Sequence, residues 1–263
     1  MNKLDQKLLE IQKRERIGLM THVVVGYPTI LDTISIVKTM ANNGADIVEL
    51  QIPFSDPLAD GPTIMRACEA SLKNGTKVAD AFSTMQILSK EVGIPLLFMA
   101  YYNTVFTYGV ESFCRDAQKA GASGLIVPDM PIEEEHNEHF LKYCKKYDLH
   151  NIQVISPAST EDRLQKNAKV ANGFVYCTAR QGITGAHGRG VTSHGLQYLE
   201  RVKKVFNIPV AVGFGISKKE HIDALKDHAD IAVIGSALID VINKSSKQDM
   251  TKNISEFLQN MVK

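Results

Sequence analysis

Short runs of valine, isoleucine and leucine recur eight times along this 263-residue chain, with polar or mixed sequence between them. Runs this short and this apolar are typical of strands that are buried on both faces. We therefore predict eight strands. The runs are THVVVG from Thr21, DIVELQI from Asp46, PLLFMAY from Pro95, GLIVPD from Gly124, NIQVISP from Asn151, GFVYCTA from Gly173, PVAVGFG from Pro209 and DIAVIGS from Asp230.

The segments between these runs have the period of a helix. One apolar stripe, for example, is formed by Val78, Ala81, Phe82, Met85 and Leu88. Alternating strands and helices imply right-handed βαβ units around a parallel sheet, and eight units are the number that closes a barrel. We therefore predict an α/β fold, a (β/α)8 TIM barrel. The alternative is an open doubly wound sheet, which would concentrate unusual residues at one switch point, whereas here they follow nearly all eight strands.

The chain begins with a pattern that predicts an extra helix. In MNKLDQKLLEIQKRERIG, residues Leu4, Leu8 and Ile11 fall on one side, and the segment lacks the apolar centre of a signal peptide. No Pro/Ser-rich tract, low-complexity stretch or long charge run divides the sequence. We predict a single TIM-barrel domain over residues 1–263.

Net charge narrows the possible binding partners, and cysteine content indicates the cellular compartment. Lys and Arg total 30 against 29 Asp and Glu, a formal net charge of +1, so no global field attracts nucleic acid or anionic lipid. The four cysteines are scattered, which indicates a reducing compartment and predicts a cytoplasmic protein. No segment is long and apolar enough to predict a membrane span.

One strand carries an acidic residue on a face that should be buried. Side chains alternate along a strand, so Ile47, Glu49 and Gln51 share one face. An ionised carboxylate without a partner is costly to bury, so Glu49 is either paired or used in chemistry. A structural pair with a barrel lysine or arginine is the alternative, but the strand patterns offer no inward-facing partner, and Arg180 is the nearest candidate.

A second carboxylate, Asp60, follows on the loop after this strand. Asp before glycine is ordinary turn chemistry, and alone it would indicate a structural role. Its closeness in sequence to Glu49, within DIVELQIPFSDPLADGP, favours a catalytic pair.

Two glycine motifs predict a phosphate site on the last two strands. GFGIS from Gly213 precedes a helix for which we predict a capping box between Ser217 and Glu220, and GSALI from Gly235 leaves Ser236 at the start of another. Glycines admit an anion close to backbone N–H groups, and helix N-termini favour negative charge. The alternative is that these glycines only form turns.

The segment RQGITGAHGRGVT, residues 180–192, holds four glycines and little to bury. Long loops of this kind in compact domains are usually functional, so we predict a mobile lid.

Several absences narrow the reaction class. No strand offers a lysine near its carboxyl end for a Schiff base, and His22, His187 and His194 lack metal-ligand spacing, so we predict no metal site. We interpret His22 as a pocket wall. No nucleophile elbow or dinucleotide fingerprint is present. The reaction class that remains is acid and base catalysis on a phosphorylated small molecule.

These motifs resemble the tryptophan synthase alpha subunit family, from the N-terminal helix to about Leu238. The most specific match is ELQIPFSDPLADGP, supported by MAYYNTVFTYG, VPDMPIEE, ARQGITG, VGFGIS and GSAL. The resemblance implies that the chain folds as a (β/α)8 barrel and acts as a carbon–carbon lyase in tryptophan biosynthesis. It would cleave indole-3-glycerol phosphate to indole and glyceraldehyde 3-phosphate without a cofactor in this chain.

The resemblance also implies a role for each matching residue. Glu49 would be the general acid that protonates indole C3, and Asp60 would interact with the indole N–H. Protonation at C3 makes the indole an electron sink, so that loss of the side-chain hydroxyl proton drives a retro-aldol cleavage. The lid residue Thr184 would hold the aspartate. The phosphate would contact Gly185, Phe214, Gly215, Gly235 and Ser236, and the pocket would include Tyr101 and Tyr176.

The family acts with a beta subunit in an alpha-beta-beta-alpha heterotetramer, and pyridoxal phosphate is expected in that beta subunit. The coupling loop would contain Pro53, Phe54, Asp56 and Pro57.

The sequence departs from the family pattern at a few positions. Gln51 stands where the family usually has glycine, so we expect its amide to reach Glu49 or to crowd the pocket. His22 replaces an aromatic pocket wall, Ile132 a proline and Ile231 a glycine. Two alternatives stay open: a catalytically weak barrel that mainly binds and activates the beta subunit, and a stand-alone indole-glycerol-phosphate lyase.

Overall fold

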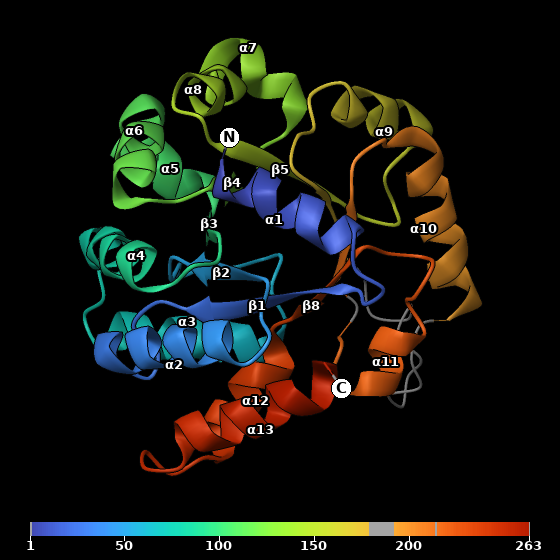
Figure 1. Cartoon of the computed structure of the whole chain (residues 1–263). Helices are drawn as coiled ribbons and strands as arrows, with labels where there is room; N and C mark the ends of the chain where they lie inside the picture. Colours follow the sequence, from blue (N-terminus) through green and yellow to red (C-terminus); the bar gives the residue numbers. More distant parts are fainter. Residues whose placement is uncertain (1, 179–191, 214, 263) are drawn as a thin grey trace.

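Eight parallel strands close into a barrel in the order of the sequence (Figure 1). We describe residues 2–178, 192–213 and 215–262 from a computed structural model. The strands coincide with the eight predicted runs, although β1 begins earlier, at Gly18. The predicted TIM barrel is confirmed, and the open sheet is wrong. The strands are β1 Gly18–Val24, β2 Ile47–Gln51, β3 Leu96–Met99, β4 Gly124–Ile126, β5 His150–Ile155, β6 Val175–Thr178, β7 Val210–Gly213 and β8 Ile231–Ile234.

Helices surround the barrel on its outside (Figure 1). The predicted stripe lies in α4, where Ala81, Met85 and Leu88 are buried. The helices are α1 Lys3–Gln12, α2 Ile30–Asn42, α3 Pro62–Lys73, α4 Val78–Glu91, α5 Tyr102–Tyr108, α6 Val110–Ala120, α7 Glu135–Glu138, α8 Phe140–Lys146, α9 Glu161–Ala168, α10 Ser193–Val205, α11 Lys219–Asp223, α12 Ser236–Lys244 and α13 Met250–Val262, with a 3-10 turn η1 at Ile132–Glu134. No helix in the described ranges is long and apolar enough to cross a membrane.

The extra N-terminal helix α1 covers one end of the barrel, as Figure 1 shows. Its apolar face, Leu4, Leu8 and Ile11, joins the cluster of inward-facing barrel side chains. The helix is fastened at its start, where Asn2 accepts a hydrogen bond from Leu4 N at 3.0 Å and donates to two carbonyl oxygens from distant loops. The predicted helix and its buried side are confirmed, and they close the N-terminal end of the barrel.

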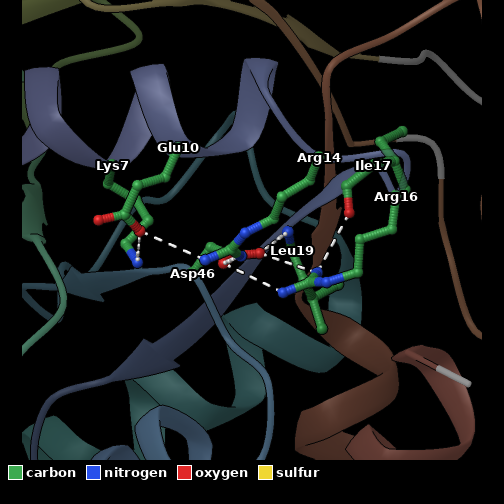
Figure 2. A network of polar contacts seen from close by, with 7 residues as sticks. All are labelled: Lys7, Glu10, Arg14, Arg16, Ile17, Leu19 and Asp46. Carbon is green, nitrogen blue, oxygen red and sulfur yellow. Dashed lines mark hydrogen bonds and ion pairs between the residues drawn. The ribbon is translucent and has the colours of Figure 1, made fainter.

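A buried carboxylate, Asp46, secures the chain where α1 leads into the barrel (Figure 2). It lies 2.7 Å from Arg14 Nη1 and 2.9 Å from Arg16 Nη1, and it accepts a hydrogen bond from Leu19 N at 3.0 Å. Its charge is therefore paired, as a charge removed from water requires.

The alternation of side chains along β2 follows the prediction. Val48 and Leu50 pack in the layer between strands and helices, whereas Ile47 packs inside the barrel. Glu49 shares the inward face and lies opposite His22 in the pairing of β1 with β2. The register therefore brings a histidine beside the predicted acid.

Candidate active site

A cavity of about 570 Å³ opens at the carboxyl ends of the strands, the end opposite to α1. This is the end at which TIM barrels carry their active sites. Both predicted carboxylates, Glu49 and Asp60, line it together with three further predicted residues, His22, Tyr176 and Gly235.

Glu49 has a partner that the sequence did not reveal. Its carboxylate Oε2 lies 3.4 Å from Nδ1 of His22, and both side chains are almost fully buried. The expectation that no inward-facing partner exists is wrong. His22 also lines the cavity, where we predicted a pocket wall.

The pairing changes the protonation of His22. Burial opposes the positive charge and would lower the pKa of His22, but attraction to the Glu49 carboxylate, together with the influence of Asp60 and Gln51, outweighs this effect. The pKa of His22 is therefore raised above its ordinary value of 6.5. The Glu49 carboxylate therefore favours the charged form of the imidazole.

Asp60 is held by two donors at the same oxygen. Gln51 Nε2 donates to Asp60 Oδ2 at 2.6 Å and Tyr101 Oη donates to it at 2.9 Å. Within the described part of the chain, Oδ1 accepts no hydrogen bond, so one oxygen is left for a ligand. The Gln51 amide thus reaches Asp60 rather than Glu49, which corrects our expectation, because the loop after β2 folds back over the strand end.

Burial raises the pKa of Asp60 above its ordinary value of 3.8, and this effect exceeds the opposing influence of His22, Gln51 and Tyr101. The nearby Glu49 carboxylate raises the pKa further. Perturbed carboxyl groups in a cavity are typical of functional sites.

Tyr101 ties the loop after β2 to the barrel. Its Oη also accepts a hydrogen bond from Ala59 N at 3.0 Å, and its ring stacks on Phe54 with centroids 5.2 Å apart. Movement of this loop would therefore be transmitted to the ring that holds Asp60.

Tyr176 forms the wall across the cavity from β2. Burial, followed by the charges of Glu49 and Asp60, raises the pKa of its hydroxyl group. A glycine is needed beside it, because a Cβ at Gly213 would lie 2.9 Å from the Tyr176 ring.

The predicted phosphate site is only partly described. Gly235 lines the cavity and is the N-cap of α12, and Ser236 is the first residue of that helix. Gly215 is exposed with a positive φ of 65°. The remaining predicted residues here, Gly185 and Phe214, lie outside the described residues, as do Thr184, Arg180 and the lid.

The predicted capping box before α11 is wrong. The helix begins at Lys219, and its N-cap residue Lys218 makes no side-chain capping hydrogen bond. Ser217 N instead donates to Nδ1 of His221 at 3.3 Å. Of the two predicted helix N-termini, that of α12 contributes the one residue, Gly235, that lines the cavity within the described part of these motifs.

The cavity has a polar side that the sequence analysis missed. Ser156 and Ser159 follow β5, Thr178 ends β6, and Arg163 reaches the cavity from α9. Ser156 lies at the carboxyl end of the predicted run NIQVISP, which was the available signal. The described residues contain no group of three or more His, Cys, Asp or Glu that could hold a metal ion.

Comparison with known proteins fits this geometry. The sequence profile of the tryptophan synthase alpha chain family matches residues 8–263. The chain belongs to the tryptophan synthase alpha chain family.

Individual members of this family align with nearly the whole chain. The alpha chain of Desulfotalea psychrophila is 43% identical over 242 residues, 92% of this chain and 94% of the relative. That of Petrotoga mobilis is 37% identical over 257 residues, 97% and 98% of the two chains. Among solved structures, Mycobacterium tuberculosis tryptophan synthase has a TM-score of 0.90 at 30% identity, with 99% of this chain and 97% of that chain covered. A tryptophan synthase complex from Pyrococcus furiosus has a TM-score of 0.84 at 28% identity, over 93% and 97% of the two chains.

Proposed function

We propose that this chain cleaves indole-3-glycerol phosphate to indole and glyceraldehyde 3-phosphate by a retro-aldol reaction. Membership of the tryptophan synthase alpha chain family indicates a lyase role in tryptophan synthesis. The observation that supports the specific reaction is the pair of carboxylates, Glu49 and Asp60, on one cavity at the carboxyl end of the barrel.

Glu49 is the general acid in this proposal. It passes a proton to indole C3, which turns the ring into an iminium that can accept electrons. The substrate hydroxyl then loses its proton to the Glu49 carboxylate, the bond from C3 to the side chain breaks, and its electron pair restores the indole. The acid is thereby regenerated, and the other product leaves as an aldehyde.

Asp60 binds the indole N–H. Its Oδ2 is occupied by Gln51 and Tyr101, which leaves Oδ1 as the acceptor for the ring nitrogen. As positive charge develops on the ring after C3 protonation, an ionised carboxylate at the nitrogen stabilises it.

The phosphate group of the substrate binds at the N-terminus of α12 in this proposal. Gly235 and Ser236 would offer backbone N–H groups that have no partner within the helix, and the helix dipole favours an anion there. Gly215, Gly185 and Phe214 complete the site, and Thr184 of the lid contacts Asp60.

We further propose that a beta subunit carrying pyridoxal phosphate binds the cavity end of the barrel, in a cytoplasmic alpha-beta-beta-alpha heterotetramer, and that residues 1–263 form one domain. The loop after β2, with Pro53, Phe54, Asp56 and Pro57, is the coupling segment. Leu58 on this loop is 92% exposed and Phe106 on α5 is 58% exposed, so apolar surface is available to a partner.

A barrel that mainly activates its partner is the second candidate. The observation that favours it is Gln51, whose amide already occupies one oxygen of Asp60 and fills space beside the site. A stand-alone lyase is the third.

An indole assay distinguishes these candidates. We expect the native chain to release indole from indole-3-glycerol phosphate, faster with its beta subunit, and we expect Asp60→Asn to lower turnover by about 100-fold or more. Stimulation of the beta subunit without any release of indole would favour the activating barrel. High turnover that no beta subunit changes would favour the stand-alone lyase. Near-native turnover of Asp60→Asn would contradict the proposed roles.

A further inference from the structure

His22 is a buried and titratable residue to which the reaction described above gives no role. Its side chain is 6% exposed and lies on β1 opposite Glu49 in the strand register. Histidine can hold or release a proton near neutral pH, which few other side chains do.

The geometry joins His22 to the acid. Nδ1 of His22 lies 3.4 Å from Oε2 of Glu49, within ion-pair distance, and this buried oxygen accepts no hydrogen bond from any residue of the described chain. His22 is thus the one described cation within ion-pair distance of Glu49. Strand pairing fixes both backbones, so this separation is built into the barrel.

We propose that His22 is a positioning residue that orients Glu49 and supplies the proton which Glu49 passes to the substrate. The proton leaves Nδ1 as the Oε2–H bond forms, and it leaves Glu49 as the C3–H bond forms. When the substrate hydroxyl group loses its proton, that proton returns through Glu49 to Nδ1. The cycle consumes no proton, and it rests on the function proposed above.

The surroundings favour a shared proton. Glu49 faces His22 from β2, and Asp60 faces it from the following loop. The phenol groups of Tyr101, which follows β3, and of Tyr176 on β6 lie at the same site. The two carboxylates raise the pKa of His22 despite its burial. The other ring nitrogen, Nε2, and Oε1 of Gln51 are both buried without a hydrogen bond in the described chain.

Two substitutions of His22 separate its roles. His22→Phe keeps an aromatic ring of similar size but removes both nitrogens. His22→Asn keeps a donor near the position of Nδ1 but cannot titrate. Thr21→Val is the matched control, because Thr21 is the adjacent β1 residue, is buried, and has an unpaired hydroxyl group that touches neither carboxylate.

The first measurement is the pH dependence of kcat and KM for indole release, with the beta subunit present. In the native chain we expect kcat to fall as the pH rises through the raised pKa of His22, since the pair then loses its proton. We expect His22→Phe to lower kcat by roughly tenfold or more, with a smaller change in KM, and to abolish this alkaline decline. We expect His22→Asn to recover part of kcat without the decline, and Thr21→Val to match the native profile.

The second measurement is the titration of the His22 imidazole by NMR, with its signal assigned by its absence from His22→Asn. We expect Glu49→Gln to lower the pKa of His22, because the negative charge of Glu49 would no longer oppose the effect of burial on that pKa. An unchanged pKa in Glu49→Gln, or an unchanged alkaline decline in both His22 variants, would overturn the inference. If either of these results were obtained while Glu49→Gln abolished turnover, the proposed function would stand and only the role of His22 would be rejected. A native chain that released no indole would instead contradict the proposed function, while the NMR titration would still decide whether the pair forms.

Discussion

Two nearby carboxylates, Asp46 just before β2 and Glu49 within it, are almost equally buried, yet they face opposite ends of the barrel. Asp46 lies at the end that α1 closes, where two arginines and a backbone N–H surround it (Figure 2). Glu49 lies at the open end and has one histidine at 3.4 Å. A fully paired carboxylate stabilises a fold, whereas an incompletely paired one beside a cavity can still exchange its proton.

The largest expected effect is on turnover at the open end. Glu49→Gln should lower kcat for indole release by about 100- to 10,000-fold, because an amide cannot deliver the proton. Its free energy of unfolding should fall less than that of Asp46→Ala, because His22, the single partner left behind, can lose its proton, whereas the arginines beside Asp46 cannot. Urea denaturation and the indole assay test both parts. A large loss of stability in Glu49→Gln would show that Glu49 resembles Asp46 and is structural.

The next effect is on stability at the closed end. Asp46→Ala should lower the free energy of unfolding by about 2–4 kcal/mol, because Leu19 N loses its acceptor and two arginines lose a buried partner. Urea denaturation measures it. Glu10→Ala is the control within the same network, and the loss of its exposed ion pairs should have a much smaller effect. Equal effects of the two substitutions would contradict the role given to Asp46.

A smaller effect is expected at Gln51, which donates a hydrogen bond to Asp60 at the open end of the barrel. Gln51→Leu removes a donor that lowers the pKa of Asp60, so that pKa should rise further. The acidic decline of kcat/KM should then move to higher pH, because Asp60 must be ionised to accept the indole N–H. KM should rise by up to roughly tenfold. A pH profile identical to that of the native chain would rule out this influence of Gln51.

The smallest effect concerns the fastening of α1. Asn2→Ala should lower the free energy of unfolding by about 1 kcal/mol, the usual effect of losing an N-cap side chain, and leave kcat unchanged. Thermal unfolding followed by circular dichroism measures it. Lys13→Ala, at the exposed other end of the helix, is the control. A fall in kcat with Asn2→Ala would show that the two ends of the barrel are coupled.

The barrel was predictable because its signals are local. Each buried strand is a short apolar run, each helix such as α4 has its own stripe, and Leu4, Leu8 and Ile11 mark the face of α1 that is buried. Those patterns place side chains on faces, so Glu49 could be assigned to the barrel interior. The capping box at Ser217 failed because helix α11 starts one residue later than that motif requires.

The partners of the functional groups depended on contacts across the fold. No local pattern relates His22 to Glu49, because the register of β1 against β2 decides which residues lie opposite. Likewise, the fold-back of the loop brings Asp60, rather than Glu49, to the Gln51 amide.

The sequence by itself thus determined the order of strands and helices, the inward face of β2 and the family to which its motifs belong, since periodicity and motifs are read along the chain. The tertiary structure alone decided which carboxylate became a fully paired anchor and which kept a single titratable partner. Pairing, burial and the resulting pKa shifts arise from groups that are distant in sequence and become neighbours only when the barrel closes.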